Sequence, residues 1–206
     1  MLEIENQKSP IIITGYGRSG TSFMAKFLQQ IGFTVGGGWN NKIEAGMESS
    51  EGSVIFRLVR EKKLKSDILK QIGVIKYDVI KNPRFLDMYD IGMEVFKYWH
   101  EVYPEFRVIL MQRAIKFTVM SYNRIKTKQI TNIEIEIVKR QKNWDLFCKY
   151  LKGKNINHII LNFPDFLNDY ESFYSRISSL RIDFDKEKGN EIWKKMVDFN
   201  KVHFNK

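Results

Sequence analysis

The stretch Ile11–Met24, which reads IIITGYGRSGTSFM, decides the fold. Its short β-branched run is typical of a buried strand. The run passes into a loop with three glycines, and an amphipathic helix begins near Thr21. Loop amides that point inward, together with the positive end of the helix dipole, form a site for an anion. Glycines let the backbone approach a phosphate with no Cβ in the way, so this stretch predicts a phosphate-bearing ligand.

Two well-known phosphate loops differ from this one. The P-loop of nucleoside triphosphatases has a lysine directly after its second glycine, whereas this chain has Thr21 after Gly20. A cation occurs earlier, at Arg18, whose guanidinium can hold an oxyanion through two hydrogen bonds. The loop also matches the dinucleotide string G-x-G-x-x-G, but a second strand ending in an acidic residue does not follow it. The loop therefore favours neither of these two ligand classes.

Two further strand ends carry a cation. The apolar run Arg107–Gln112 predicts a strand; Arg113 follows it, and Ser121 comes eight residues later in a helix-like stretch. A guanidinium at a strand end and a hydroxyl from an early helical turn can hold one phosphate from two sides. Lys81 follows another predicted strand and precedes Asn82-Pro83. The chain therefore predicts three cation-bearing sites at strand ends.

These three motifs occur in the order found in sulfotransferases. The residues Arg-Ser-Gly-Thr-Ser at 18–22 resemble that family's 5′-phosphosulfate loop, and Arg113 with Ser121 resembles its 3′-phosphate motif. Lys81 resembles the lysine of the Lys-x-Pro element in bacterial and heparan-modifying members, which reaches the bridging oxygen of the donor. Ala114-Ile115 departs from the Asp-Pro that the family often has there. The resemblance covers about residues 10–125.

The resemblance implies a sulfotransferase that uses 3′-phosphoadenosine 5′-phosphosulfate (PAPS) as co-substrate. Such an enzyme moves a sulfuryl group to a hydroxyl or an amine and needs no metal, because side-chain cations replace Mg²⁺. Arg18 and Lys81 would offset the charge that builds on the bridging oxygen. The residues expected to bind the co-substrate are Gly15, Gly17, Arg18, Ser19, Gly20, Thr21, Ser22, Arg113 and Ser121.

The reaction also requires a base to take the proton of the acceptor. We expect Glu48 in this role, with Glu51 second and Glu44 third, since they follow a Gly-rich run that resembles the acceptor-side loop of bacterial sulfotransferases. Trp39 and Tyr122 are the candidates to stack on the adenine. The histidines are expected to be structural or solvated; they are His100, His158 and His203.

The composition bounds the architecture. The 206 residues, 43% of them apolar, suit one α/β domain spanning residues 1–206. Alternating strands and helices predict a three-layer fold, a mostly parallel sheet with helices on both faces, whose ligands bind at the carboxyl ends of the strands. The expected strands are 11–14, 74–80, 107–112 and 157–161, and the expected helices are 21–31, 53–69, 91–103, 116–125, 132–151, 164–180 and 187–200.

Charge and targeting signals restrict the partners. The net charge of +10 would suit nucleic acid, but the basic residues are scattered, so no nucleic-acid partner is expected. No apolar run approaches a membrane span and no signal peptide is apparent, so a cytoplasmic protein without a membrane anchor is expected. Cys148 is the single cysteine, which excludes an internal disulfide.

Two other functions stay open at this point. One is a P-loop kinase acting on a nucleotide or small molecule, and the other is a non-enzymatic module that binds nucleic acid or another polyanion. For the sulfotransferase, we expect a small-molecule or glycan acceptor. The sequence names neither this acceptor nor the oligomeric state.

Overall fold

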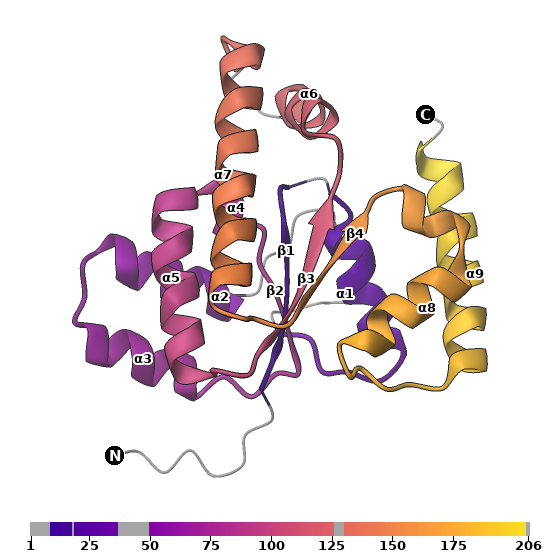
Figure 1. The fold of residues 1–206 in the computed structure, drawn as a ribbon, viewed down its shortest axis with the longest axis horizontal. Coiled ribbons are helices and arrows are strands. Elements are labelled where there is room, and N and C mark those ends of the chain that lie inside the picture. Colours follow the sequence, from indigo (N-terminus) through magenta and orange to yellow (C-terminus); the bar gives the residue numbers. More distant parts are fainter. Residues whose placement is uncertain (1–8, 18, 37–49, 126–129, 205–206) are drawn as a thin grey trace.

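The structure, a computed structural model, describes residues 9–17, 19–36, 50–125 and 130–204. The side chains of residues 50–53, 122–125 and 199–204 lie outside this description. Four strands form one parallel sheet in the order β2-β1-β3-β4 (Figure 1). They are β1 (Ile11–Gly15), β2 (Val79–Lys81), β3 (Arg107–Gln112) and β4 (His158–Asn162).

The register places all four carboxyl ends along one edge of the sheet. Ile13 pairs with Lys81, and Gly15 pairs with Met111. On the other side of β3, Gln112 pairs with Asn162. Because parallel strands end together, the segments that follow them meet at this edge, which is where open α/β sheets bind ligands.

Helices cover both faces of the sheet, which confirms the predicted three-layer α/β fold (Figure 1). α2, α3, α4, α5 and α7 contribute to the hydrophobic cluster on one face, and α1, α8 and α9 to the cluster on the other. The helices are α1 (Thr21–Gln30), α2 (Ser50–Arg60), α3 (Lys65–Gly73), α4 (Arg84–Asp87), α5 (Tyr89–Val102), α6 (Ile115–Ile125), α7 (Ile133–Gly153), α8 (Tyr170–Ser179) and α9 (Lys186–Phe204), with a 3₁₀ turn at η1 (Asp165–Asn168).

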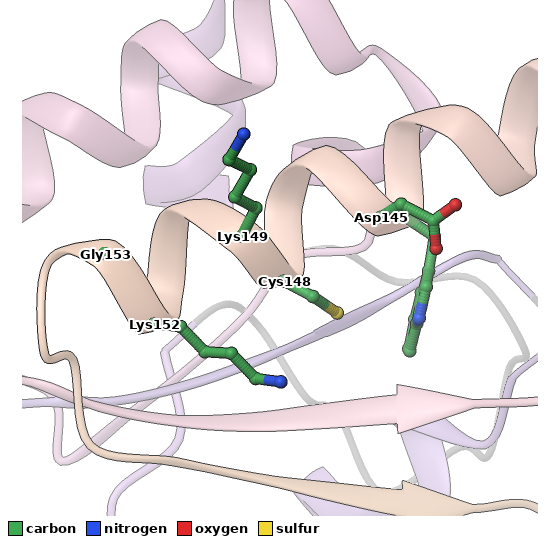
Figure 2. A pocket seen from close by; sticks show the side chains of 6 residues that line it. Asp145, Cys148, Lys149, Lys152 and Gly153 are labelled. Carbon is green, nitrogen blue, oxygen red and sulfur yellow. The ribbon is translucent and has the colours of Figure 1, made fainter.

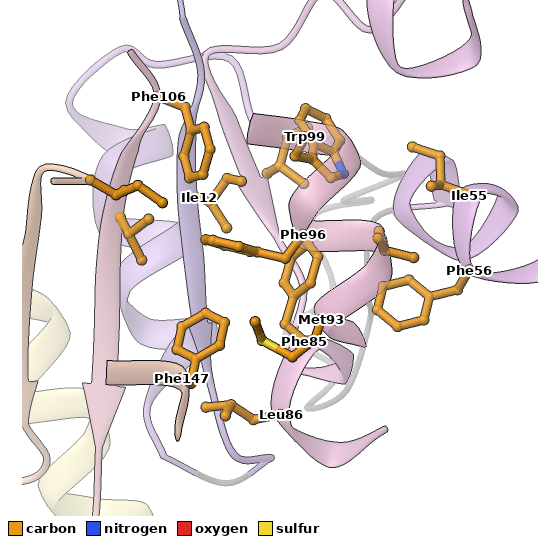
Figure 3. Packing of buried hydrophobic residues seen from close by; sticks show 14 of the residues in the cluster. Ile12, Ile55, Phe56, Phe85, Leu86, Met93, Phe96, Trp99, Phe106 and Phe147 are labelled. Carbon is orange, nitrogen blue, oxygen red and sulfur yellow. The ribbon is translucent and has the colours of Figure 1, made fainter. Parts of the chain in front are cut away.

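The alternation of β1 side chains separates two cores. Ile12 joins the first cluster, and Ile11 and Ile13 join the second. Figure 3 shows aromatic rings of the first cluster on the side of β1 that carries Ile12; among them, Phe96 and Phe147 pack edge to face. All three isoleucines are fully buried, so β1 is covered on both faces, as expected for a central parallel strand.

Three expected elements differ from the structure. The strand expected over 74–80 is confined to Val79–Lys81, and Val74 is exposed. The single helix expected over 53–69 is two helices, interrupted near Lys62, whose φ of 54° lies in the left-handed region. The helix expected over 164–180 begins with the 3₁₀ turn η1 before α8.

The long helix α7 also differs in which side chains it buries. Helical spacing in the sequence assigns Ile135 and Leu146 to the same apolar side as Trp144 and Phe147, but Ile135 and Leu146 are exposed. Trp144 and Phe147 are buried as expected. In the ranges that the structure covers, no helix combines the length and the apolar character needed to cross a membrane.

Candidate active site

The loop between β1 and α1 has two glycines that the local backbone requires. Gly15 has a φ of 149°, and a Cβ there would lie 2.2 Å from the Met111 carbonyl oxygen and 2.6 Å from Ser19 Oγ. Gly20 has a φ of 91°, and a Cβ there would lie 2.5 Å from Cδ2 of Phe163. The loop therefore packs so closely against the ends of β3 and β4 that any side chain at these two positions would collide with its surroundings.

The start of α1 has the properties of an anion site. Its N-cap is Gly20, which has no side chain to accept a hydrogen bond from the first helical amides, and its first turn holds no acidic residue. The amides of a first helical turn have no acceptor within the helix. They and the helix dipole therefore favour an anion.

Two buried hydroxyls lie in the segment that leads to this helix: Thr14 is in β1, and Ser19 directly precedes the N-cap Gly20. Thr14 and Ser19 are 0% and 1% exposed, and neither hydroxyl oxygen finds a hydrogen-bond partner among the described residues. Burying a hydroxyl without a hydrogen-bond partner costs free energy, so such hydroxyls commonly bind a ligand or a water molecule. Ser19 and Thr14, which no sequence motif indicated, are therefore candidates to bind a ligand or a water.

Two loop amides already have partners within the protein. The Gly17 amide donates to Asp87 Oδ2 at 3.2 Å, and the Ser19 amide donates to the Tyr16 carbonyl at 3.1 Å. The main-chain donors best suited to an incoming anion are therefore those of Thr21 and Ser22 in the first turn of α1.

Lys81 ends β2 at the same edge of the sheet. Its side chain is only 2% exposed, and its neighbour Asn82 is 1% exposed. The Asn82 amide donates to the Ile13 carbonyl at 2.9 Å, and Asn82 Oδ1 accepts from the Arg84 amide at 3.0 Å. These bonds fix the backbone that carries Lys81 beside β1. Lys81 therefore brings a cationic side chain to the edge of the sheet where β1 passes into the loop before α1.

Arg113 follows β3 and is linked to the start of α1 through one aromatic ring. Its guanidinium carbon lies 5.8 Å from the centre of the Phe163 ring and 5.9 Å from that of Phe117. Phe163 is the ring that touches Gly20. Because Phe163 directly follows β4, it sits between the predicted 5′-phosphate loop and the predicted 3′-phosphate cation. Ser121 lies in α6 and is half-buried.

Several predicted residues fall outside the description. Arg18, Glu44, Glu48 and Trp39 lie outside the described residues, as do the side chains of Glu51 and Tyr122. Their roles stay predictions.

The two histidines whose side chains are described lie away from the carboxyl edge. His158 begins β4, and its Nδ1 is 2.8 Å from the Ile156 carbonyl. His100 is near the end of α5, 3.4 Å from the Tyr150 hydroxyl and in ring contact with Phe106, which precedes β3. Burial lowers the pKa of His100. Both positions lie at the amino ends of the strands, as expected for histidines that are structural rather than catalytic.

Two hollows open near the first core. The larger, of about 570 Å³, runs along α7 and is lined by residues from Trp144 to Gly153 (Figure 2). Its lining residues come from successive turns of that helix. The smaller, of about 260 Å³, is bounded by Asp87, Tyr89, Asp90 and Lys139. Asp87 also accepts a hydrogen bond from the Gly17 amide, so the smaller hollow adjoins the loop between β1 and α1, which we call the anion loop.

Among the described side chains, no group of three or more His, Cys, Asp or Glu lies close enough to hold a metal ion.

The arrangement of strands and helices is also found in a solved sulfotransferase. The crystal structure of sulfotransferase STF1 from Mycobacterium tuberculosis superposes with a TM-score of 0.55 over 91% of this chain and 71% of that chain, at 12% sequence identity. The fold is sulfotransferase-like. No protein-family profile matches the sequence, and no curated protein matches it. At this identity the likeness concerns the fold, and the chemistry has to be argued from the site itself.

Proposed function

We propose that the protein transfers a sulfuryl group from PAPS to a hydroxyl or amine of an acceptor. One observation carries the proposal: the glycine-led start of α1 directly follows Ser19, whose buried hydroxyl has no partner among the described residues, and shares the Phe163 ring with Arg113. A donor with a 5′-phosphosulfate and a separate 3′-phosphate needs two cationic sites joined by a surface for the nucleoside. The start of α1 and Arg113 would supply them.

Each group would have a defined task. The first-turn amides of α1, with the hydroxyls of Thr21 and Ser22, would bind the 5′-phosphate. Lys81, and Arg18 outside the described residues, would offset negative charge on the bridging oxygen as its bond to sulfur breaks. Arg113 and Ser121 would hold the 3′-phosphate and so fix the angle at which the acceptor attacks.

The acceptor would enter from the side of α5. The hollow bounded by Asp87, Tyr89, Asp90 and Lys139 adjoins the loop and has a volume of about 260 Å³, which suits part of a small molecule or one sugar residue. Glu48 is proposed as the base that takes the acceptor's proton. The sulfuryl group leaves the phosphate oxygen and bonds to the acceptor oxygen or nitrogen, and adenosine 3′,5′-bisphosphate departs.

Binding measurements test the proposal directly. Adenosine 3′,5′-bisphosphate should raise the melting temperature more than AMP does, and more than ATP with Mg²⁺. Arg113→Ala should remove most of the preference for the bisphosphate over AMP, because only the bisphosphate carries the 3′-phosphate. Arg60→Ala on the exposed side of α2 is the matched control and should change neither ligand.

Three results would contradict the proposal. Preferential stabilisation by ATP with Mg²⁺ would favour a kinase. Binding of RNA with a steep salt dependence, and no effect of the bisphosphate, would favour a polyanion-binding module. An equal loss of bisphosphate and AMP binding in Arg113→Ala would reject the 3′-phosphate assignment. Turnover is then measured as release of the bisphosphate from PAPS in the presence of phenols, sugars and amines.

A further inference from the structure

Four buried or half-buried side chains connect α4 and α7 to the anion loop. They are Asp87, Arg140, Tyr16 and Glu136. Asp87, the last residue of α4, accepts a hydrogen bond from the Gly17 amide through Oδ2. A Cβ at Gly17 would lie only 3.0 Å from that oxygen, so glycine permits this close approach. The other carboxylate oxygen, Oδ1, lies 3.5 Å from a terminal guanidinium nitrogen of Arg140 in α7.

Arg140 holds the loop in a second way. Its guanidinium carbon is 4.9 Å from the centre of the Tyr16 ring, and the Tyr16 hydroxyl donates to the Arg140 carbonyl at 2.5 Å. Its Nε donates to Glu136 Oε1 at 2.8 Å, which fixes the guanidinium along α7. The Arg140 side chain is 6% exposed, so these contacts form in a region of low dielectric.

The charges of this group have a consequence for an incoming anion. A carboxylate bonded to one amide of an anion loop repels a phosphate at the neighbouring amides. Arg140 faces this carboxylate and offsets its charge. Glu136 shares the guanidinium, but its side chain is 27% exposed against 17% for Asp87, so solvent screens it more.

We propose that Asp87 and Arg140 are positioning residues for the donor site: Asp87 tethers the loop at Gly17, and Arg140 neutralises Asp87 so that the tether does not repel the donor. The inference rests on the proposed function, because it takes the loop to be the anion site. Neither residue needs to touch the donor.

Two substitutions separate the tether from the charge. Asp87→Asn keeps an oxygen that can accept from Gly17 but removes the charge, so affinity for adenosine 3′,5′-bisphosphate should hold or rise. Arg140→Met keeps much of the apolar bulk but removes the positive charge that faces the Asp87 carboxylate, so the net charge beside the loop becomes more negative by one. Its affinity should fall on the order of tenfold, as expected for one additional charge near the ligand at an effective dielectric constant of about 20.

The double variant is the decisive measurement. Asp87→Asn in the Arg140→Met protein restores the net charge of the wild type beside the loop, so it should recover most of the lost affinity. A purely structural role for Arg140 predicts no recovery, because the contacts to Tyr16 and Glu136 stay lost. Titrations with the bisphosphate and with inorganic sulfate would be made on folded protein, as judged by circular dichroism. Glu171→Gln, which breaks the exposed pair of Glu171 with Lys186, is the control and should leave both ligands unaffected.

The tether is tested without any ligand. Hydrogen exchange at the Gly17 amide should be faster in Asp87→Ala than in the wild type, and unchanged in Glu171→Gln. Unchanged exchange in Asp87→Ala overturns the tether, and equal affinities of Arg140→Met and the double variant overturn the charge role. Failure of the wild-type protein to bind either anion would refute the proposed function instead, and the charge role of Arg140 with it.

Discussion

Replacing Gly20 with alanine tests the tight start of α1. The added Cβ would be unfavourable for two reasons, the backbone conformation at residue 20 and the closeness of the Phe163 ring. The backbone has a φ of 91°, in the left-handed region, and the Cβ would lie 2.5 Å from Phe163 Cδ2 and 2.8 Å from Phe163 Cγ. The methyl group can be accommodated only if the ring moves or the loop shifts, and both changes disturb the surface that Arg113 shares.

The expected loss of stability is the sum of these two effects. A residue other than glycine in the left-handed region costs about 1–2 kcal/mol. Forcing an extra carbon into a packed site costs about 1–3 kcal/mol. We therefore expect Gly20→Ala to lower the free energy of unfolding by about 2–5 kcal/mol, a large part of the stability of an ordinary domain.

The chain offers matched controls. Gly32 has a φ of 111°, and nothing lies within 4 Å of the position that a Cβ would take, so Gly32→Ala should show the backbone cost alone. Gly153 ends α7, also with nothing within 4 Å, and has no positive φ; Gly153→Ala should be neutral or slightly stabilising. Urea denaturation followed by circular dichroism would give all three free energies of unfolding.

A loss in Gly20→Ala no greater than that in Gly32→Ala would refute the reasoning, because it would mean that Phe163 does not crowd Gly20. A double-mutant cycle gives a second check. In a Phe163→Ala background the clash is gone, so Gly20→Ala should then cost about as much as Gly32→Ala.

Three further predictions concern stability and binding. Ser19→Ala removes a buried hydroxyl that has no partner among the described residues, so the free energy of unfolding should hold or rise by about 1 kcal/mol while affinity for adenosine 3′,5′-bisphosphate falls; unchanged affinity in a titration would reject its anion role. Phe96→Ala removes a fully buried ring that packs on Phe85, Phe106 and Phe147, so the urea-derived stability should fall by about 3–5 kcal/mol; a loss below about 1 kcal/mol would mean that the core does not depend on this ring. The pKa of Tyr170 is raised from 10.0 to about 12, mainly because burial disfavours the charged phenolate. The contribution of Tyr170 to stability is therefore complete below pH 10 and is lost as the pH rises toward 12. Tyr170→Phe should flatten that decline in the urea midpoint, and an undiminished slope would show that Tyr170 is not its source.

The sheet was predictable where the sequence pattern is local. The strand expected over 107–112 has the bounds of β3, because its apolar run is flanked by polar residues and both of its faces are buried. The expectation for β2 was too long, because Ile75 is an apolar residue that packs into the core from outside the strand. Apolar character alone does not distinguish a strand from a loop that is buried against the same core.

The burial of α7 was predicted less well for a similar reason. Ile135 and Val138 are 66% and 68% exposed, although both are apolar. The amino-terminal part of α7 extends past the sheet toward α6, so it has less core to cover there (Figure 1). Helical periodicity identifies one face of a helix, but it does not tell how far along the helix the core extends.

The site was predictable where a motif is continuous in the sequence. The loop from Gly15 to Ser22 could be read from its glycines and from the helix that follows. Phe163, Asp87 and Arg140 could not be found in this way, since each reaches the loop from a distant segment and has no motif around it. The partnership of Asp87 with Arg140 depends on how α4 packs against α7, which only the folded chain specifies.

Because β1 lies between β2 and β3 in the sheet, its pairing with both neighbours has to wait until they have been synthesised. Ile11, Ile12 and Ile13 leave the ribosome well before either neighbouring strand, because their partners begin at Val79 and Arg107. At bacterial or eukaryotic elongation rates the interval before β3 emerges is on the order of ten seconds. Until β2 emerges, this apolar, β-branched segment has no native strand partner, although α1 follows it directly, and it can pair with other chains. We therefore expect the yield of folded protein to depend on chaperones that bind the nascent chain.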